Sequence, residues 1–190
     1  MYKVFEKEIN YINNERIRKS LIIILKKLPD YFYKDPASST GKYHPKYALN
    51  EGGLVRHTKA AVRIAKELLD NPSLNDFTDD EKDLIIFSLM IHDGLKSGLK
   101  KNKYTLFEHP ILISDFIKDN KNKLDLSDEE INFISDAVLT HMGPWTKNYK
   151  GEEVLTPPTS KSQKFVHMCD YLASRKFLEI KFDKDNNIIY

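Results

Sequence analysis

His92 and Asp93 stand side by side at the end of an apolar segment, directly before Gly94 and a group of lysines. Counted back in steps of three and four residues, both continue apolar rows, so both point toward the interior at a last helical turn. Imidazole and carboxylate are the ligands that Mn, Fe, Co, Ni and Zn accept in proteins. The pair can hold one ion together, or its carboxylate can bridge two.

Four further donors fall on the inner sides of other expected helices or at their ends: His57, His109, His141 and Asp170. A buried carboxylate without a partner costs several kcal/mol. Any one of these histidines alone would more often be an ordinary core or surface residue. Their combination is hard to explain by packing and favours a divalent metal site.

Helical periodicity in the apolar residues indicates the elements that position these donors. Three segments begin with Ser or Thr followed three residues later by Glu or Gln, the pattern of a capping box: Thr78 with Glu81, Ser127 with Glu130, and Ser160 with Gln163. The expected helices are 4–12, 15–28, 53–69, 79–92, 106–118, 128–141 and 160–176. The fold class is therefore all-α, a helical bundle, with a short C-terminal β-hairpin expected in the tail after 176.

Length and composition bound the remaining choices. With 190 residues, of which 41% are hydrophobic, the chain is expected to form a single domain over 1–190. A net charge of +2 gives no general affinity for duplex nucleic acid or for membranes. Cys169 is the single cysteine, no apolar run is long enough to span a bilayer, and the start of the chain lacks the apolar core of a signal peptide. A cytoplasmic protein is the expectation.

The ordered set His57, His92-Asp93 and Asp170 resembles the signature of the HD-domain superfamily of metal-dependent phosphohydrolases. The segments "GGLVRHT", "MIHDGLKSG", "THMG" and "PPTSKSQKFVHMCDYLASR" resemble the elements of that family, and the likeness covers 43–176. It is greatest to the catalytic domain of the YhaM-type 3′-5′ exoribonucleases. In "HDGLK" the glycine stands one place earlier than usual. Residues 1–28 are expected to be helices rather than an oligonucleotide-binding domain, which counts against polymeric RNA as substrate.

The resemblance implies an HD-domain helical bundle with two divalent ions, drawn from Mn, Fe, Co, Ni, Mg and Zn. The first ion would be held by His57, His92, Asp93 and Asp170. Asp93 would bridge to a second, held by His109 and His141. The ion pair would activate a water as hydroxide, which attacks phosphorus.

Substrate contacts are expected from residues near these donors. Lys96 would neutralise a phosphate oxygen, and Arg175 would do the same from the opposite wall or else lie at a solvated helix end. His44 would approach the substrate or lie at the surface. Two long irregular stretches, 29–53 and 142–159, are candidate pocket walls. Their aromatic residues would stack on a base or else seal a core edge: Trp145, Tyr43, Tyr47 and Tyr149.

The expected partner is a small phosphorylated substrate, a nucleotide or short oligonucleotide. A homo-oligomer is compatible with the sequence. Lys100, Lys101 and Lys103 are expected to be solvated, with attraction of an anionic substrate as the alternative. His167 is expected to contact a ligand residue or the surface rather than a metal. Two other functions remain open: a mixed-valence di-iron oxygenase with the same ligands, and a nucleotide-binding module without turnover.

Overall fold

The computed structural model of the chain describes residues 1–38, 44–176, 181–182, 184 and 188–189. Helices dominate these residues, as the periodicity predicts, and the all-α fold class is confirmed. Seven α-helices follow one another: α1 (Glu6–Ile9), α2 (Glu15–Leu25), α3 (Gly53–Leu69), α4 (Asp79–Ile91), α5 (His109–Asp119), α6 (Asp128–Leu139) and α7 (Lys161–Ala173). Shorter elements are the 3-10 helices η1 (Tyr2–Phe5), η2 (Asp30–Tyr33), η3 (Lys46–Ala48) and η4 (Lys121–Lys123), and the strands β1 (Lys181–Phe182) and β2 (Ile188–Ile189).

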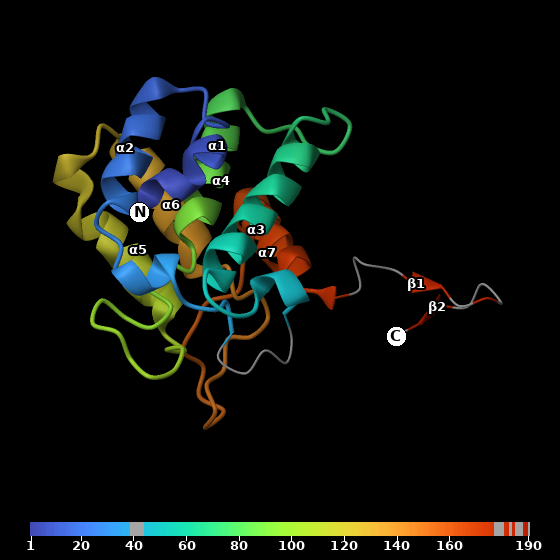
Figure 1. Cartoon of the computed structure of the whole chain (residues 1–190). Helices are drawn as coiled ribbons and strands as arrows, with labels where there is room; N and C mark the ends of the chain where they lie inside the picture. Colours follow the sequence, from blue (N-terminus) through green and yellow to red (C-terminus); the bar gives the residue numbers. More distant parts are fainter. Residues whose placement is uncertain (39–43, 177–180, 183, 185–187, 190) are drawn as a thin grey trace.

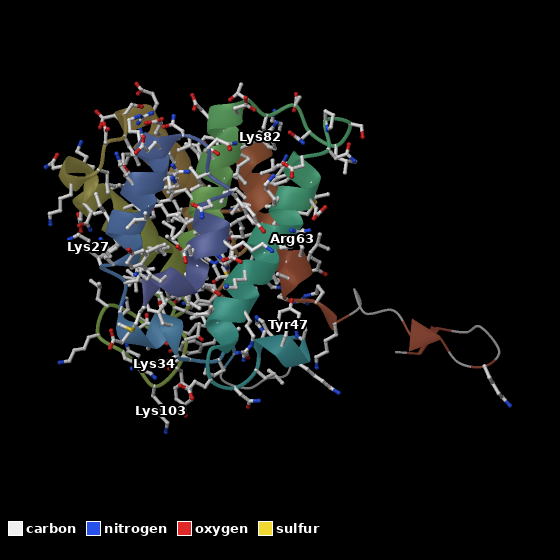
Figure 2. All side chains as sticks on the ribbon, turned by 45° about the horizontal axis from the view of Figure 1, so that its top comes forward. Lys27, Lys34, Tyr47, Arg63, Lys82 and Lys103 are labelled. Carbon is white, nitrogen blue, oxygen red and sulfur yellow. The ribbon has the colours of Figure 1, made fainter. Side chains whose placement is uncertain are left out.

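Helix α4 is the central element of the bundle (Figure 1). It packs against α2, α3, α6 and α7, while α3 pairs with α7 and α5 pairs with α6. Every residue of α4 from Asp83 to Ile91 is buried, which explains why its sequence is a nearly continuous apolar run. Charged side chains such as Lys34, Arg63 and Lys103 extend from the outside of the bundle (Figure 2).

The helix starts agree closely with the sequence. All three capping boxes form with both of their hydrogen bonds, and α3 begins and ends where its periodicity predicts. The tail holds the expected hairpin as a short antiparallel pair, with Lys181 opposite Ile189 and Phe182 opposite Ile188. Among the described residues, no helix is both long and apolar enough to cross a membrane.

The differences from the expected helices lie at their ends. The first is α-helical over only 6–9 of the expected 4–12, and α2 and α7 each end three residues early. Helix α4 ends at Ile91 and α6 at Leu139, so His92 and His141 follow the last helical residues instead of lying within them. Gly143 has a φ of 66°, a left-handed conformation that closes the turn after α6. Helix α5 begins at His109 rather than at 106 and accepts Pro110 in its first turn, where the backbone N–H is not needed.

Candidate metal centre

The six predicted donors converge in the middle of the bundle from five of its helices. His57 lies within α3 and Asp170 within α7, while the other four lie at helix ends. Five side chains are buried, with at most 2% of each exposed: His57, His92, Asp93, His109 and His141. The side chain of Asp170 is 17% exposed and opens onto a cavity.

The donors divide into two groups of three, each with its ligand atoms within 4.8 Å of one another. One group is His57, His92 and Asp170, and the other is Asp93, His109 and His141. Within the first, His57 Nε2 lies 2.9 Å from Asp170 Oδ1 and 3.3 Å from His92 Nε2. Each group can hold a metal ion.

Asp93 lies between the two groups and faces both. Its Oδ1 is 3.2 Å from His109 Nε2 and 3.8 Å from His141 Nε2. Its Oδ2 is 3.7 Å from His57 Nε2 and 3.6 Å from His92 Nε2. A carboxylate placed this way has one oxygen for each group, which is the arrangement required of a bridging ligand.

Backbone carbonyls orient three of the imidazoles. The Nδ1 atoms of His92, His109 and His141 each pair with the carbonyl three residues earlier, at 2.7, 2.8 and 2.6 Å. A carbonyl can only accept, so each Nδ1 carries a proton, and whenever the ring is neutral its lone pair is on Nε2. The Nε2 atoms of His109 and His141 are 3.1 Å apart. Two lone pairs at that distance need a proton or a metal cation between them, so this donor set fits bound metal.

Burial and neighbouring charges shift the pKa values of the groups in the centre strongly. Burial alone would lower the pKa of His92, but Asp93 and Asp170 outweigh it and raise that pKa to about 9. Burial acts against ionisation of Asp93 too, yet Lys96 and His92 hold its pKa well below the ordinary value. Burial, reinforced by His109 and His92, lowers the pKa of His141 to about 3. Without metal, His92 is therefore a buried cation near pH 7.

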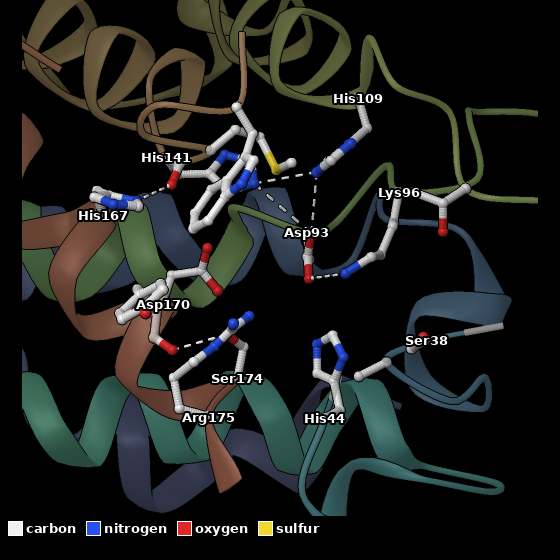
Figure 3. A pocket seen from close by; sticks show the side chains of 15 residues that line it. Ser38, His44, Asp93, Lys96, His109, His141, His167, Asp170, Ser174 and Arg175 are labelled. Carbon is white, nitrogen blue, oxygen red and sulfur yellow. Dashed lines mark hydrogen bonds and ion pairs between the residues drawn. The ribbon is translucent and has the colours of Figure 1, made fainter. Parts of the chain in front are cut away.

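A cavity of about 260 Å³ opens beside these donors (Figure 3). Asp93, His109, His141 and Asp170 line it, so the cavity borders both donor groups. The two long irregular stretches both contribute walls. Ser38 and His44 come from the first, and Met142 and Trp145 come from the second.

The expected substrate-contacting residues all line this cavity: Lys96, Arg175, Trp145 and His44. Lys96 Nζ lies 2.6 Å from Asp93 Oδ2, and its side chain is 15% exposed. Arg175 lies on the other wall below Asp170 in Figure 3, and its Nε donates to Ser174 Oγ at 2.9 Å. Lys96 and Arg175 therefore approach the acidic centre from different sides.

His44 contacts the centre directly, because its ring meets the His57 ring edge to face at 5.2 Å between centroids. Burial, together with the charges of His57 and Lys96, lowers the pKa of His44 to about 4. Its Nδ1 is buried and meets no hydrogen-bond partner within the described part of the chain. His44 is therefore neutral near pH 7, half-buried, and part of the cavity wall.

The aromatic residues behave differently from one another. Trp145 stacks on Tyr171 with ring centroids 5.8 Å apart and planes at 18°. Tyr47 instead donates its hydroxyl to Ala173 O at 2.6 Å, and Tyr149 is 92% exposed and lines neither described cavity. Tyr43 lies outside the described residues. Of the expected stacking residues that are described, Trp145 is the one in the cavity wall.

Tyr171 and His167 are cavity residues that the sequence did not assign to the wall. Tyr171 follows a donor directly and precedes Arg175 by one helical turn, and the Arg175 guanidinium lies 4.6 Å from its ring centroid. From that spacing Tyr171 could have been predicted to line the cavity. His167 Nδ1 bonds the backbone carbonyl of His141 at 2.7 Å, so it contacts a donor residue without reaching its ligand atom. Gly143 is needed here, because a Cβ on it would lie 2.2 Å from the His167 ring.

No protein-family model, no curated protein and no solved structure matches this chain.

Proposed function

We propose that this chain is a metal-dependent phosphohydrolase of the HD-domain superfamily. Its substrate would be a nucleotide or short oligonucleotide, cleaved at a phosphoester or phosphoanhydride bond. The observation that carries the proposal is the position of Asp93, which has one oxygen toward each histidine group and Lys96 against it on the cavity side. The ligands for two metal ions therefore lie next to an ammonium group that could bind a phosphate.

His57, His92 and Asp170 would hold one divalent ion and His109 and His141 the other, with Asp93 shared between them. When bound, such ions supply Lewis acidity and make water nucleophilic near neutral pH. The backbone carbonyls behind three of the imidazoles keep their Nε2 atoms aimed at the centre. The single cysteine is a free, buried thiol, which is in keeping with a reducing cytoplasm.

Lys96 and Arg175 would bind and orient the phosphate. The Lys96 ammonium has three donors, so it can contact a phosphate oxygen while it still touches Asp93. The Arg175 guanidinium is held by Ser174 and by the Tyr171 ring, which leaves its planar fork ordered at the cavity wall. Positive charge from two walls would stabilise the negative charge on the phosphoryl oxygens during hydrolysis.

Neutral His44 offers a hydrogen bond to the substrate without adding charge. In Figure 3 His44 lies on the same side of the cavity as Lys96, where phosphate oxygens would lie. Trp145 packs against His167 and Tyr171 against Arg175, on the opposite side of Figure 3, and this stacked pair presents aromatic surface that suits a nucleobase. The substrate expected from this distribution has both a flat ring and a phosphate.

The test is a metal determination combined with hydrolysis assays. Protein purified anaerobically should contain close to two divalent ions per chain. It should then release phosphate or nucleotide from at least one member of a panel of mono-, di-, tri- and cyclic nucleotides and dinucleotides. Asp93→Asn should abolish this release, because the shared ligand is weakened. Fully metal-loaded protein that hydrolyses nothing in the panel would refute the proposal.

Two controls separate the alternative functions in the same preparations. An oxygenase would contain iron, consume O₂ and give the spin signal of a mixed-valence pair. A binding module would take up nucleotide in calorimetry and return it unchanged.

A further inference from the structure

A second chamber of about 130 Å³ adjoins the metal cavity. Lys96 and Thr105 line both spaces, so the two are separated by little more than these side chains. The walls of the second chamber come mainly from the loop between α4 and α5, with a contribution from η2 and the residues after it. Lys101, Asn102 and Lys103 are the loop residues at its mouth.

Positive charge predominates in the lysine chamber, our name for this second space. Lys96, Lys101 and Lys103 line it, and Asp35 is the acidic residue in its wall. Lys101 Nζ lies 2.7 Å from Asp35 Oδ2, with the two side chains 55% and 24% exposed. Lys96 is likewise paired, with Asp93 Oδ2 at 2.6 Å, so an anion would share both of these lysines with a carboxylate. Lys103 instead lies over the Tyr104 ring.

The loop that carries these lysines is held in place by buried contacts. The Tyr31 hydroxyl donates to Gly98 O at 2.8 Å and accepts from Ser97 N–H at 3.0 Å. Leu106 N–H donates to Lys96 O at 2.9 Å and so closes the base of the loop. Because Tyr31 is 5% exposed, the anchor lies within the protein. The base of the loop is therefore anchored within the protein, and the exposed Lys101, Asn102 and Lys103 extend from that base.

The expectation from the sequence is the same for Lys100, Lys101 and Lys103, but their positions relative to the lysine chamber differ. Lys101 and Lys103 line the lysine chamber, whereas the neighbouring Lys100 lines neither described cavity. All three side chains belong to exposed residues, so general attraction would not distinguish them. This difference supplies a matched control on the same loop.

Aromatic residues and the lysine chamber lie on different sides of the metal cavity. Trp145 packs against His167 and Tyr171 against Arg175, and these two partners lie across the cavity from Lys96 in Figure 3. Lys96 leads to the lysine chamber. We propose that the lysine chamber binds the terminal phosphates of a nucleoside di- or triphosphate whose base lies against Trp145. This rests on the proposed function and deepens it by selecting nucleoside polyphosphates over monophosphates.

The test is binding without turnover. Adenosine mono-, di- and triphosphate analogues, with methylene groups in place of the cleavable oxygens, are titrated calorimetrically into Mn²⁺-loaded protein at fixed free Mn²⁺. Affinity should increase with the number of phosphates. Lys103→Gln and Lys101→Gln should each weaken the triphosphate analogue about fivefold, the size of one partly exposed charge pair, and leave the monophosphate unchanged.

Two further variants make the test specific. Lys100→Gln should bind all three analogues like the wild type. Asp35→Asn removes the acidic residue and frees Lys101, so it should tighten the triphosphate analogue. Unfolding temperatures of the four variants show whether the loop is intact, and Lys103→Gln preserves the Lys101 ion pair with Asp35.

The outcomes separate this inference from the proposed function. If Lys101→Gln and Lys103→Gln match Lys100→Gln, or weaken mono- and triphosphate equally, the lysine chamber has no such role. If a dinucleotide analogue, and not the triphosphate, shows the lysine dependence, the chamber takes a second nucleotide and the proposal is wrong. Lysine-dependent binding of the triphosphate with no hydrolysis of natural nucleotides would refute the proposed function alone.

Discussion

The Nε2 atoms of His109 and His141 face each other at 3.1 Å, while the Nδ1 atom of each ring donates to a backbone carbonyl. The two rings are thus already oriented to bind one metal ion together before any ion is present. Metal should therefore stabilise the fold. At a free concentration of one hundred times Kd, a bound ion should add about 2.7 kcal/mol to the free energy of unfolding.

Chelation is the direct measurement of that stabilisation. Protein treated with a chelator should unfold at a lower temperature than metal-loaded protein in calorimetry, and added Mn²⁺ or Zn²⁺ should restore the transition. Asp170→Asn should respond less to metal than the wild type. Equal unfolding temperatures with and without metal would show that the six donors are a structural polar cluster.

Metal stoichiometry should follow the two donor groups. His141→Gln and His57→Gln should each lose about one ion, because each removes a donor from a different group. Asp93→Asn should lower the occupancy of both sites, since its oxygens face both. His167→Gln is the matched control, because His167 touches the backbone carbonyl of His141 and not the centre. Elemental analysis of the dialysed variants distinguishes these cases, and an Asp93→Asn protein with one full site would show that the carboxylate is not shared.

Metal binding should release a proton from His92. The pKa of this residue is raised from 6.5 to about 9, so without metal it is protonated at pH 7.5 and must lose that proton to bind an ion. Affinity at its site should rise about tenfold per pH unit up to pH 9. Calorimetry in two buffers of different ionisation enthalpy counts the protons, and an identical apparent enthalpy in both would contradict the assignment.

The same shift predicts how stability depends on pH. A raised pKa means that the folded state holds the His92 proton more tightly than the unfolded state. This contribution is complete below pH 6.5 and is lost as the pH rises through 9. Metal-free protein should therefore lose stability over that interval. Metal-loaded protein should not show this loss, because its His92 is already neutral; denaturant midpoints at several pH values give the comparison.

Lys96 should matter for turnover more than for metal binding. Lys96→Met removes the ammonium beside Asp93, and we expect kcat to fall about a hundredfold, as for loss of one group that stabilises developing charge. The metal content should remain near that of the wild type. Lys100→Met, on the exposed part of the same loop, should retain full activity. A Lys96 variant that loses its metal and its activity together would assign the residue a structural role.

Trp145 should increase the affinity of the protein only for ligands that carry a nucleobase. Trp145→Ala should raise Kd for a nucleotide about tenfold, near the lower end of measured stacking energies, and leave glycerol phosphate unaffected. Tyr149→Ala is the control, because this ring belongs to the same stretch and is 92% exposed. Equal weakening of nucleotide and glycerol phosphate would mean that Trp145 only shapes the cavity.

The sequence predicted the parts of this structure that depend on local chemistry. A capping box needs a side chain three residues away, so Thr78, Ser127 and Ser160 could be assigned from the sequence. The donors could be found because imidazole and carboxylate groups on apolar faces need a partner. The two groupings could not be derived in this way, because the distances from Asp93 to His57, His109 and His141 depend on how α3, α5 and α6 pack around it.

The cavity walls were harder to predict for the same reason. Lys100 and Lys101 are adjacent and chemically identical, and only the path of the loop decides which one lines the lysine chamber. That path depends on Gly98, with a φ of 88°, and on the hydroxyl of Tyr31, which is 67 residues away in sequence. Periodicity carries no information about such a contact.

His57 and Asp170 touch at the centre although 113 residues separate them in the chain. With one cysteine, the protein cannot close this long span by a disulfide. An ion ligated by both residues would act as a reversible cross-link between α3 and α7, restricting the chain much as a covalent bridge does. The cross-link could form only after Asp170 has been synthesised. The supply of metal would then determine how much of the newly made protein becomes cross-linked.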